Sequence, residues 1–104
     1  MAGKAVLSGM GMPGNKYEDV TVGASGTTYT APANGYFCSQ GNFSDGNGYI
    51  ELLNNTKRNI GTVAKSSSNN WSFHVFVPCQ KGDQVAVYYV GGANLTFLYA
   101  EGDQ

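Results

Sequence analysis

Apolar side chains recur at every second position along most of this chain. The clearest example is the segment 71–77, where Trp71, Phe73, Val75 and Val77 alternate with other residues. A period of two is typical of a β-strand with one buried face, whereas an amphipathic helix repeats every 3.6 residues. No segment of the chain shows the helical period, so we expect strands throughout.

Turn residues separate the alternating segments. In Pro32-Ala33-Asn34-Gly35, Pro fixes φ early and Asn-Gly allows positive φ late, which suits a tight turn. The alternating segments and the turns together predict eight strands, at residues 17–22, 27–31, 35–43, 48–53, 58–64, 71–77, 84–90 and 94–100. Their spacing of roughly 8–12 residues indicates an all-β sandwich or small barrel, and two four-stranded sheets in Greek-key order form a jelly roll.

The first residues lack this alternation. Residues 8–15 are punctuated by Gly and Pro, as in linkers and extended arms. We therefore divide the chain into a flexible arm (1–16), a jelly-roll domain (17–102) and a short tail (103–104).

Composition narrows the function classes. Only 12% of the 104 residues are charged, about half of the usual ~25%. The six Lys and Arg residues are scattered and the net charge is −1, which argues against a nucleic-acid partner. No apolar run approaches the ~20 residues that span a bilayer, so we expect no membrane insertion. The apolar stretch near the N-terminus is too short for a signal peptide.

Catalytic constellations are missing from the sequence. The single histidine, His74, lies in mid-strand, and no Gly-x-Ser-x-Gly elbow is present. Two cysteines do not support a zinc site, and Asp45-Gly46-Asn47-Gly48 lacks the rest of a calcium loop. We expect no enzyme activity, no metal and no cofactor.

Three segments together resemble a known family. The segment 29–37 (Tyr-Thr-Ala-Pro-Ala-Asn-Gly-Tyr-Phe) resembles the "aP-x-x-G-x-Y-x-F" stretch of complement-type globular heads. The segment 78–87 resembles their "x-x-G-D-x-V-x-V" hairpin, and 95–99 stands where they have a last apolar strand. The pattern, with its final Tyr-Ala-Glu-Gly, also looks like small domains of bacteriophage fibres. The resemblance implies a tumour-necrosis-factor-like jelly roll, usually a homotrimer.

The resemblance also implies a strand map. Lettered A to H, the strands form an inner sheet A-H-C-F and an outer sheet B-G-D-E. The expected trimer contacts lie on the inner-sheet strands and are Tyr36, Cys38, Phe73, Val75, Phe97 and Tyr99. Which face points to the axis stays open, because a one-residue slip reverses it.

The same map places two further features. Cys38 and Cys79 fall at coincident ends of strands C and F and form a candidate proximal pair, the alternative being two unrelated small core residues. The loops 23–26, 44–47, 65–70 and 91–93 gather at the end away from the arm. Uncharged amides and aromatics there suit a sugar; the alternative is a solvated loop cluster without a ligand. The candidate ligand residues are Asp45, Asn47, Asn69, Asn70, Trp71 and Asn94.

These features lead to one expected function and two alternatives. We expect a trimeric structural domain of a phage-like virion, assembled in a host cytoplasm. It would be a fibre tip or decoration domain that attaches to a host-cell surface glycan or protein. The alternatives are a stand-alone carbohydrate-binding module or lectin, and a secreted extracellular ligand of the complement or cytokine type.

Overall fold

The computed structural model describes residues 12–102 and shows eight strands with no α-helix among them. The only helical segment in that range is the 3-10 turn η1 (Asn55–Lys57). The strands are β1 (Pro13–Asp19), β2 (Thr27–Thr30), β3 (Gly35–Phe43), β4 (Tyr49–Asn54), β5 (Ile60–Lys65), β6 (Trp71–Cys79), β7 (Gln84–Val90) and β8 (Thr96–Ala100). The all-β prediction is confirmed.

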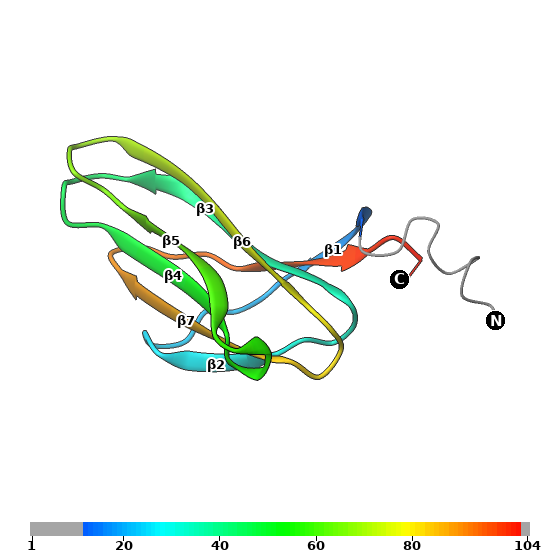
Figure 1. Cartoon of the computed structure of the whole chain (residues 1–104). Helices are drawn as coiled ribbons and strands as arrows, with labels where there is room; N and C mark the ends of the chain where they lie inside the picture. The colour runs from blue at the N-terminus through cyan, green and yellow to red at the C-terminus, as the bar shows by residue number, and fades with distance from the viewer. Residues whose placement is uncertain (1–11, 103–104) are drawn as a thin grey trace.

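The strands form two four-stranded antiparallel sheets that pack face to face (Figure 1). One sheet has the order β1-β8-β3-β6 and the other β2-β7-β4-β5. In letters these are A-H-C-F and B-G-D-E, the predicted jelly-roll order. Because β1 and β8 are neighbours, the two ends of the fold lie in the same sheet.

The core lies between the sheets and follows the period of two. On β6, Phe73, Val75 and Val77 are buried, while Trp71 at the strand's end is 42% exposed. On β8 and β3, the rings of Phe97 and Phe37 meet edge to face with centroids 5.0 Å apart. Aromatic pairs of this geometry stabilise a core beyond their buried area.

The first strand begins earlier than predicted. β1 starts at Pro13 and not at Tyr17, so residues 13–16 form part of a strand. Pro and Gly are tolerated here because β1 is an edge strand that pairs only with β8. A β-bulge between Pro13 and Tyr17 shifts the register. The rest of the predicted arm (1–11) and the tail (103–104) lie outside the described residues.

Four loops gather at one end of the sandwich, as predicted. The Val20 amide donates to the Leu95 carbonyl (2.9 Å), and the Ser66 amide donates to the Gly48 carbonyl (3.0 Å). At the other end the Glu101 amide donates to the Met12 carbonyl (2.7 Å). The described chain therefore enters and leaves at the end opposite the loops (Figure 1).

A buried polar cluster closes that entry end. The amide nitrogen of Asn54 donates to Asp83 (3.0 Å), whose carboxylate also accepts from Lys57 Nζ (2.7 Å) and the Gln80 amide (2.9 Å). Burial raises the pKa of the Asp83 carboxyl, but these hydrogen bonds and the Lys57 charge outweigh it and leave the pKa lowered. Asp83 follows Gly82, which has φ +91°. The Gly-Asp pair of the sequence motif is thus structural.

The open edge of β6 is protected by a side chain of the other sheet. The Thr62 hydroxyl on β5 donates to the Phe76 carbonyl (2.8 Å) and accepts from the Phe76 amide (3.1 Å). An unprotected edge would offer these main-chain groups to another strand. Association by strand pairing is therefore disfavoured at this edge.

Candidate functional site

The outward side of the β1-β8-β3-β6 sheet carries a continuous band of apolar side chains. In register, one row crosses the sheet as Tyr17, Leu98, Tyr36 and Pro78. The next row contains Cys38 and Phe76, and the rings of Tyr36 and Phe76 meet with centroids 6.0 Å apart. We call the set Tyr17, Tyr36, Cys38, Phe76 and Leu98 the aromatic face.

The aromatic face is open in the single chain. Tyr17 is 64% exposed and Phe76 is 54% exposed. A mainly apolar groove of about 610 Å³ runs across this face and is bordered by Asp19 and His74 at its polar margins. Large exposed apolar patches on soluble domains mark interaction surfaces.

The opposite sheet does not offer an equivalent surface. It also exposes four large apolar side chains, Ile60, Val63, Tyr88 and Val90. Glu51 stands between Val63 and Tyr88 in one row, paired with both. Lys65 follows in the next row. Charged residues therefore lie within these rows, whereas the row of Tyr17, Leu98, Tyr36 and Pro78 on the aromatic face has no charged residue.

The predicted trimer contacts divide between the two sides of the sheet. Tyr36 and Cys38 belong to the aromatic face. The other four predicted residues, Phe73, Val75, Phe97 and Tyr99, are 0–7% exposed in the single chain because they point into the core. These four side chains have the opposite parity to Tyr36 and Cys38 along their strands and pack in the core of the single chain. Contact of the inner-sheet strands with another chain stays a prediction.

The two cysteines are not a pair. Their strands, β3 and β6, are antiparallel neighbours as predicted, but Cys79 is in register with Gly35 and Cys38 with Phe76. They are three rows apart, about 10 Å along the strands, beyond the ~7 Å limit for a disulfide. Their thiols also lie on opposite sides of the sheet, and both cysteines are free. Burial raises the pKa of both thiols, that of Cys79 to about 12.

The histidine and the acidic residues do not converge. His74 is exposed at the margin of the aromatic face, in register with Gln40. Within residues 12–102, no three His, Cys, Asp or Glu side chains come close enough to hold a metal ion.

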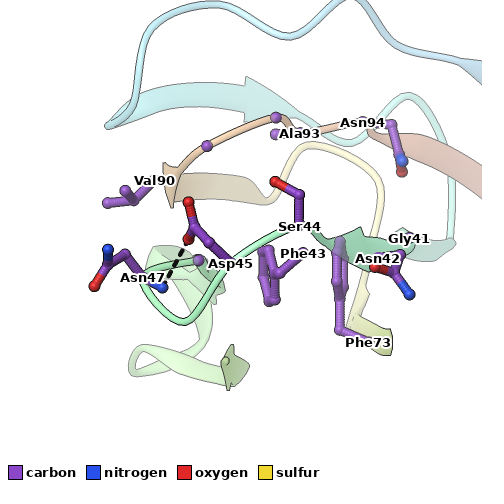
Figure 2. Close-up of a pocket in the computed structure, with 13 residues that line it drawn as sticks. Gly41, Asn42, Phe43, Ser44, Asp45, Asn47, Phe73, Val90, Ala93 and Asn94 are labelled. Atoms are coloured by element: carbon purple, nitrogen blue, oxygen red, sulfur yellow. Dashed lines mark hydrogen bonds between the residues drawn. The ribbon is translucent and has the colours of Figure 1, made fainter. Parts of the chain in front are cut away.

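A second concave feature, which we call the distal pocket, lies at the loop end. It has a volume of about 470 Å³ and opens between the turn 44–48 and the segment 90–94. Ser44 and Asp45 point from the turn toward that segment, above the rings of Phe43 and Phe73 (Figure 2). These rings stack with centroids 4.4 Å apart.

Glycines allow this packing. A Cβ at the buried Gly48 would collide with the Phe43 ring, and a Cβ at Gly41 would lie 3.3 Å from the Phe73 ring. The backbone can therefore lie directly against the rings that form the base of the pocket.

The distal pocket contains half of the predicted ligand residues. Asp45, Asn47 and Asn94 line it, whereas Asn69, Asn70 and Trp71 do not. Asn70 instead adopts the left-handed conformation (φ 58°), which Asn tolerates in turns. Asn69 and Asn70 belong to the neighbouring loop and Trp71 begins β6, and all three are exposed.

Asn94 has a structural role that the sequence did not reveal. Its oxygen accepts from the Ser39 hydroxyl and the Gln40 amide (both 3.2 Å), and its nitrogen donates to the Gln40 carbonyl (2.6 Å). These bonds attach the segment before β8 to β3. They occupy the amide of Asn94, so its function is to position the pocket wall.

Several site residues were missed at the sequence level. On the aromatic face these are Tyr17, Phe76 and Leu98. In the distal pocket, Ser44 and residues 91–93 lie in two of the predicted loops but were not among the candidate ligand residues. The alternation of β6 indicated that Phe76 faces away from Phe73 and Val75. That parity was the available signal for the aromatic face.

Comparisons with protein-family models, curated proteins and solved structures found no match for this chain. In the part of the chain that the structure describes, no helix is long and apolar enough to cross a membrane.

Proposed function

We propose that this chain is a homotrimeric jelly-roll domain of the tumour-necrosis-factor type that serves as a structural part of a phage-like virion. It forms a fibre tip or decoration domain and attaches to a glycan or protein on a host-cell surface. The observation that carries the proposal is the aromatic face, an apolar surface on the sheet that holds the first and last strands. Trimers of this type bury that sheet near their axis.

The arrangement of the two ends supports the same proposal. Chains that run parallel to a threefold axis would all enter at one end, where Met12 and Glu101 are joined. The loops would then point away from any stalk, toward a host surface. Three copies of one weak site act together on a dense surface, which raises avidity without new contacts.

The contribution of the aromatic face to assembly follows from its exposed area. A Phe side chain buries up to ~150–250 Å², and Phe76 is 54% exposed in the single chain. Burying about 100 Å² of it gives about 2–3 kcal/mol at ~25 cal/mol per Å². This corresponds to a roughly 30–150-fold change in the affinity of each subunit contact.

Native mass spectrometry of matched variants tests the assembly. We expect Phe76→Ser to shift the population from trimer to monomer. Val63→Ser, which removes an equally exposed apolar side chain from the opposite sheet, should leave the trimer unchanged. If both variants remain trimeric, or both dissociate equally, the aromatic face is not the interface.

Binding of the fluorescently labelled chain to a panel of intact bacterial cells tests attachment. We expect labelling of some strains, and loss of labelling after periodate oxidation if the receptor is a glycan. Labelling that survives periodate but not protease treatment indicates a protein receptor. Failure to label any strain would contradict attachment.

A further inference from the structure

We propose that the distal pocket binds a neutral saccharide, with Asp45 as its principal hydrogen-bond acceptor. This inference rests on the proposed attachment function and specifies the site and the chemical class of its ligand. The volume of the distal pocket, about 470 Å³, falls within the ~300–1,000 Å³ that is typical of small-molecule sites.

The first observation is that polar groups of the pocket retain unused hydrogen-bonding capacity. The Asp45 carboxylate accepts one hydrogen bond, from the Asn47 amide (2.8 Å), and an ionised carboxylate has about four acceptor sites. Within residues 12–102, no hydrogen bond engages the Ser44 hydroxyl, the Asn47 side chain or the backbone of residues 92–93. A ligand with several hydroxyl groups can both donate to and accept from this set.

The second observation is that hydrogen bonds anchor the turn 44–48 on one wall and Asn94 on the other. The Ser66 hydroxyl, itself 7% exposed, donates to the Asp45 carbonyl and accepts from the Gly48 amide, both at 2.7 Å. On the other wall, Asn94 is held by its three hydrogen bonds to β3. A preformed site loses little conformational entropy when its ligand binds.

The third observation concerns charge and apolar contact. Among the described residues, no Lys or Arg lines the pocket, and Asp45 is its one charged group. An anionic ligand, such as a phosphate or a sialylated sugar, would be repelled and unpaired there. Val90 stands at the rim and is 54% exposed, so it can contact the C–H groups of a sugar ring (Figure 2). Together these features favour an uncharged polyol over an anion.

The wall of residues 91–93 adds main-chain groups to the site. A Cβ placed at Gly91 or Gly92 would meet nothing within 4 Å, so these two residues are not packed against other side chains. Because Gly91 and Gly92 have no side chains, a sugar can approach their backbone amides and carbonyls directly. Asp45 and Ser44 face these groups across the gap (Figure 2).

Chemical-shift perturbation with neutral monosaccharides tests the proposal. The ¹H–¹⁵N spectrum of the full chain is titrated with methyl glycosides of glucose, galactose and mannose, and separately with glucuronate as the anionic comparison. We expect at least one neutral sugar to cause saturable shifts of the amides of Asp45, Asn47 and residues 91–93. Glucuronate should cause none there.

Two variants with matched charge changes complete the experiment. Asp45→Asn retains an oxygen that can accept from the Asn47 amide but loses the carboxylate, and we expect at least about tenfold weaker binding, because an uncharged acceptor forms weaker hydrogen bonds. Glu101→Gln removes a charge at the opposite end and should bind as the wild type does. Shifts confined to other surfaces, no response to any neutral sugar, or unchanged affinity in Asp45→Asn would overturn the proposal.

The outcome is distinguishable from a failure of the trimer. A chain that is trimeric by native mass spectrometry but does not respond to sugars contradicts only the saccharide site. A monomeric chain that binds a sugar in the distal pocket contradicts only the assembly.

Discussion

Replacing Asp83 by Asn removes the charge from the buried cluster at the entry end while keeping its shape. The carboxylate accepts from three donors: Asn54 Nδ2, Lys57 Nζ and the Gln80 amide. In Asp83→Asn, the amide oxygen can still accept from Asn54 and Gln80, but the new NH₂ group must face Lys57. Because the Lys57 side chain is 40% exposed, it can turn toward water.

The magnitude follows from these contacts. Losing an ion pair whose lysine is largely solvated costs about 0.2–1 kcal/mol. The hydrogen bonds from Asn54 and Gln80 change from charge-assisted to neutral, which costs about 1 kcal/mol for each bond. We therefore expect Asp83→Asn to lower the free energy of unfolding by about 2–3 kcal/mol. Asp83→Ala, which leaves the buried donors unpaired, should cost about 3–5 kcal/mol.

The effect has a defined pH dependence. The folded-state pKa of Asp83 is lowered, so its stabilising contribution is present above the ordinary Asp pKa of ~3.9 and is lost as the pH falls through the folded-state value. Wild type and Asp83→Asn should therefore differ at neutral pH and converge in acid.

Thermal unfolding followed by circular dichroism, at one fixed protein concentration, measures this difference. A loss of 2–3 kcal/mol corresponds to a Tm lowered by roughly 10–20 °C in a domain of this size. Glu101→Gln, an exposed charge removed from the same end, should leave the Tm nearly unchanged. A Tm for Asp83→Asn within about 2 °C of wild type, or the same pH dependence of Tm in wild type and Asp83→Asn, would contradict a stabilising role of the Asp83 charge.

Three further predictions concern the fold and its cysteines. Gly35→Ala should lower the free energy of unfolding by about 1–3 kcal/mol or more, since its Cβ would collide with a main-chain carbonyl of β8. At Gly92 a Cβ would meet open space, so Gly92→Ala should leave the Tm unchanged in thermal unfolding. In a monomeric variant, alkylation followed by mass spectrometry should modify Cys38 faster than Cys79, whose thiol pKa is about 12; a mass two hydrogens lower without reductant would instead reveal a disulfide. Asn94→Ala should lose about 2–3 kcal/mol by denaturant unfolding, because three hydrogen bonds to β3 disappear, and an unchanged unfolding midpoint would contradict its structural role.

The strands that could be predicted best are those bounded by strong turn residues. β3 and β7 have the predicted bounds, 35–43 and 84–90, because Asn34-Gly35 and Lys81-Gly82-Asp83 stop the alternation abruptly. β1 was misplaced because Pro13 and Gly14 are typical of a linker. Only its position at a sheet edge, a tertiary property, makes them acceptable in a strand.

The candidate sites were less predictable than the strands. The period of two identifies two sides of β6 and β8 but not which side another chain could contact, so core residues such as Phe97 were assigned to the interface. The role of Asn94 depends on partners 54 and 55 residues away. The packing of the loops therefore decides which amide groups form hydrogen bonds within the protein and which remain available to a ligand. The local sequence does not show this.

Sedimentation equilibrium of the unmodified chain at micromolar concentration tests the central claim most directly. We expect a single species with three times the 11.0 kDa mass of the chain, which dissociates when Phe76 is replaced by Ser. A stable monomer of 11.0 kDa would contradict the proposed trimer and leave the aromatic face without the role assigned to it.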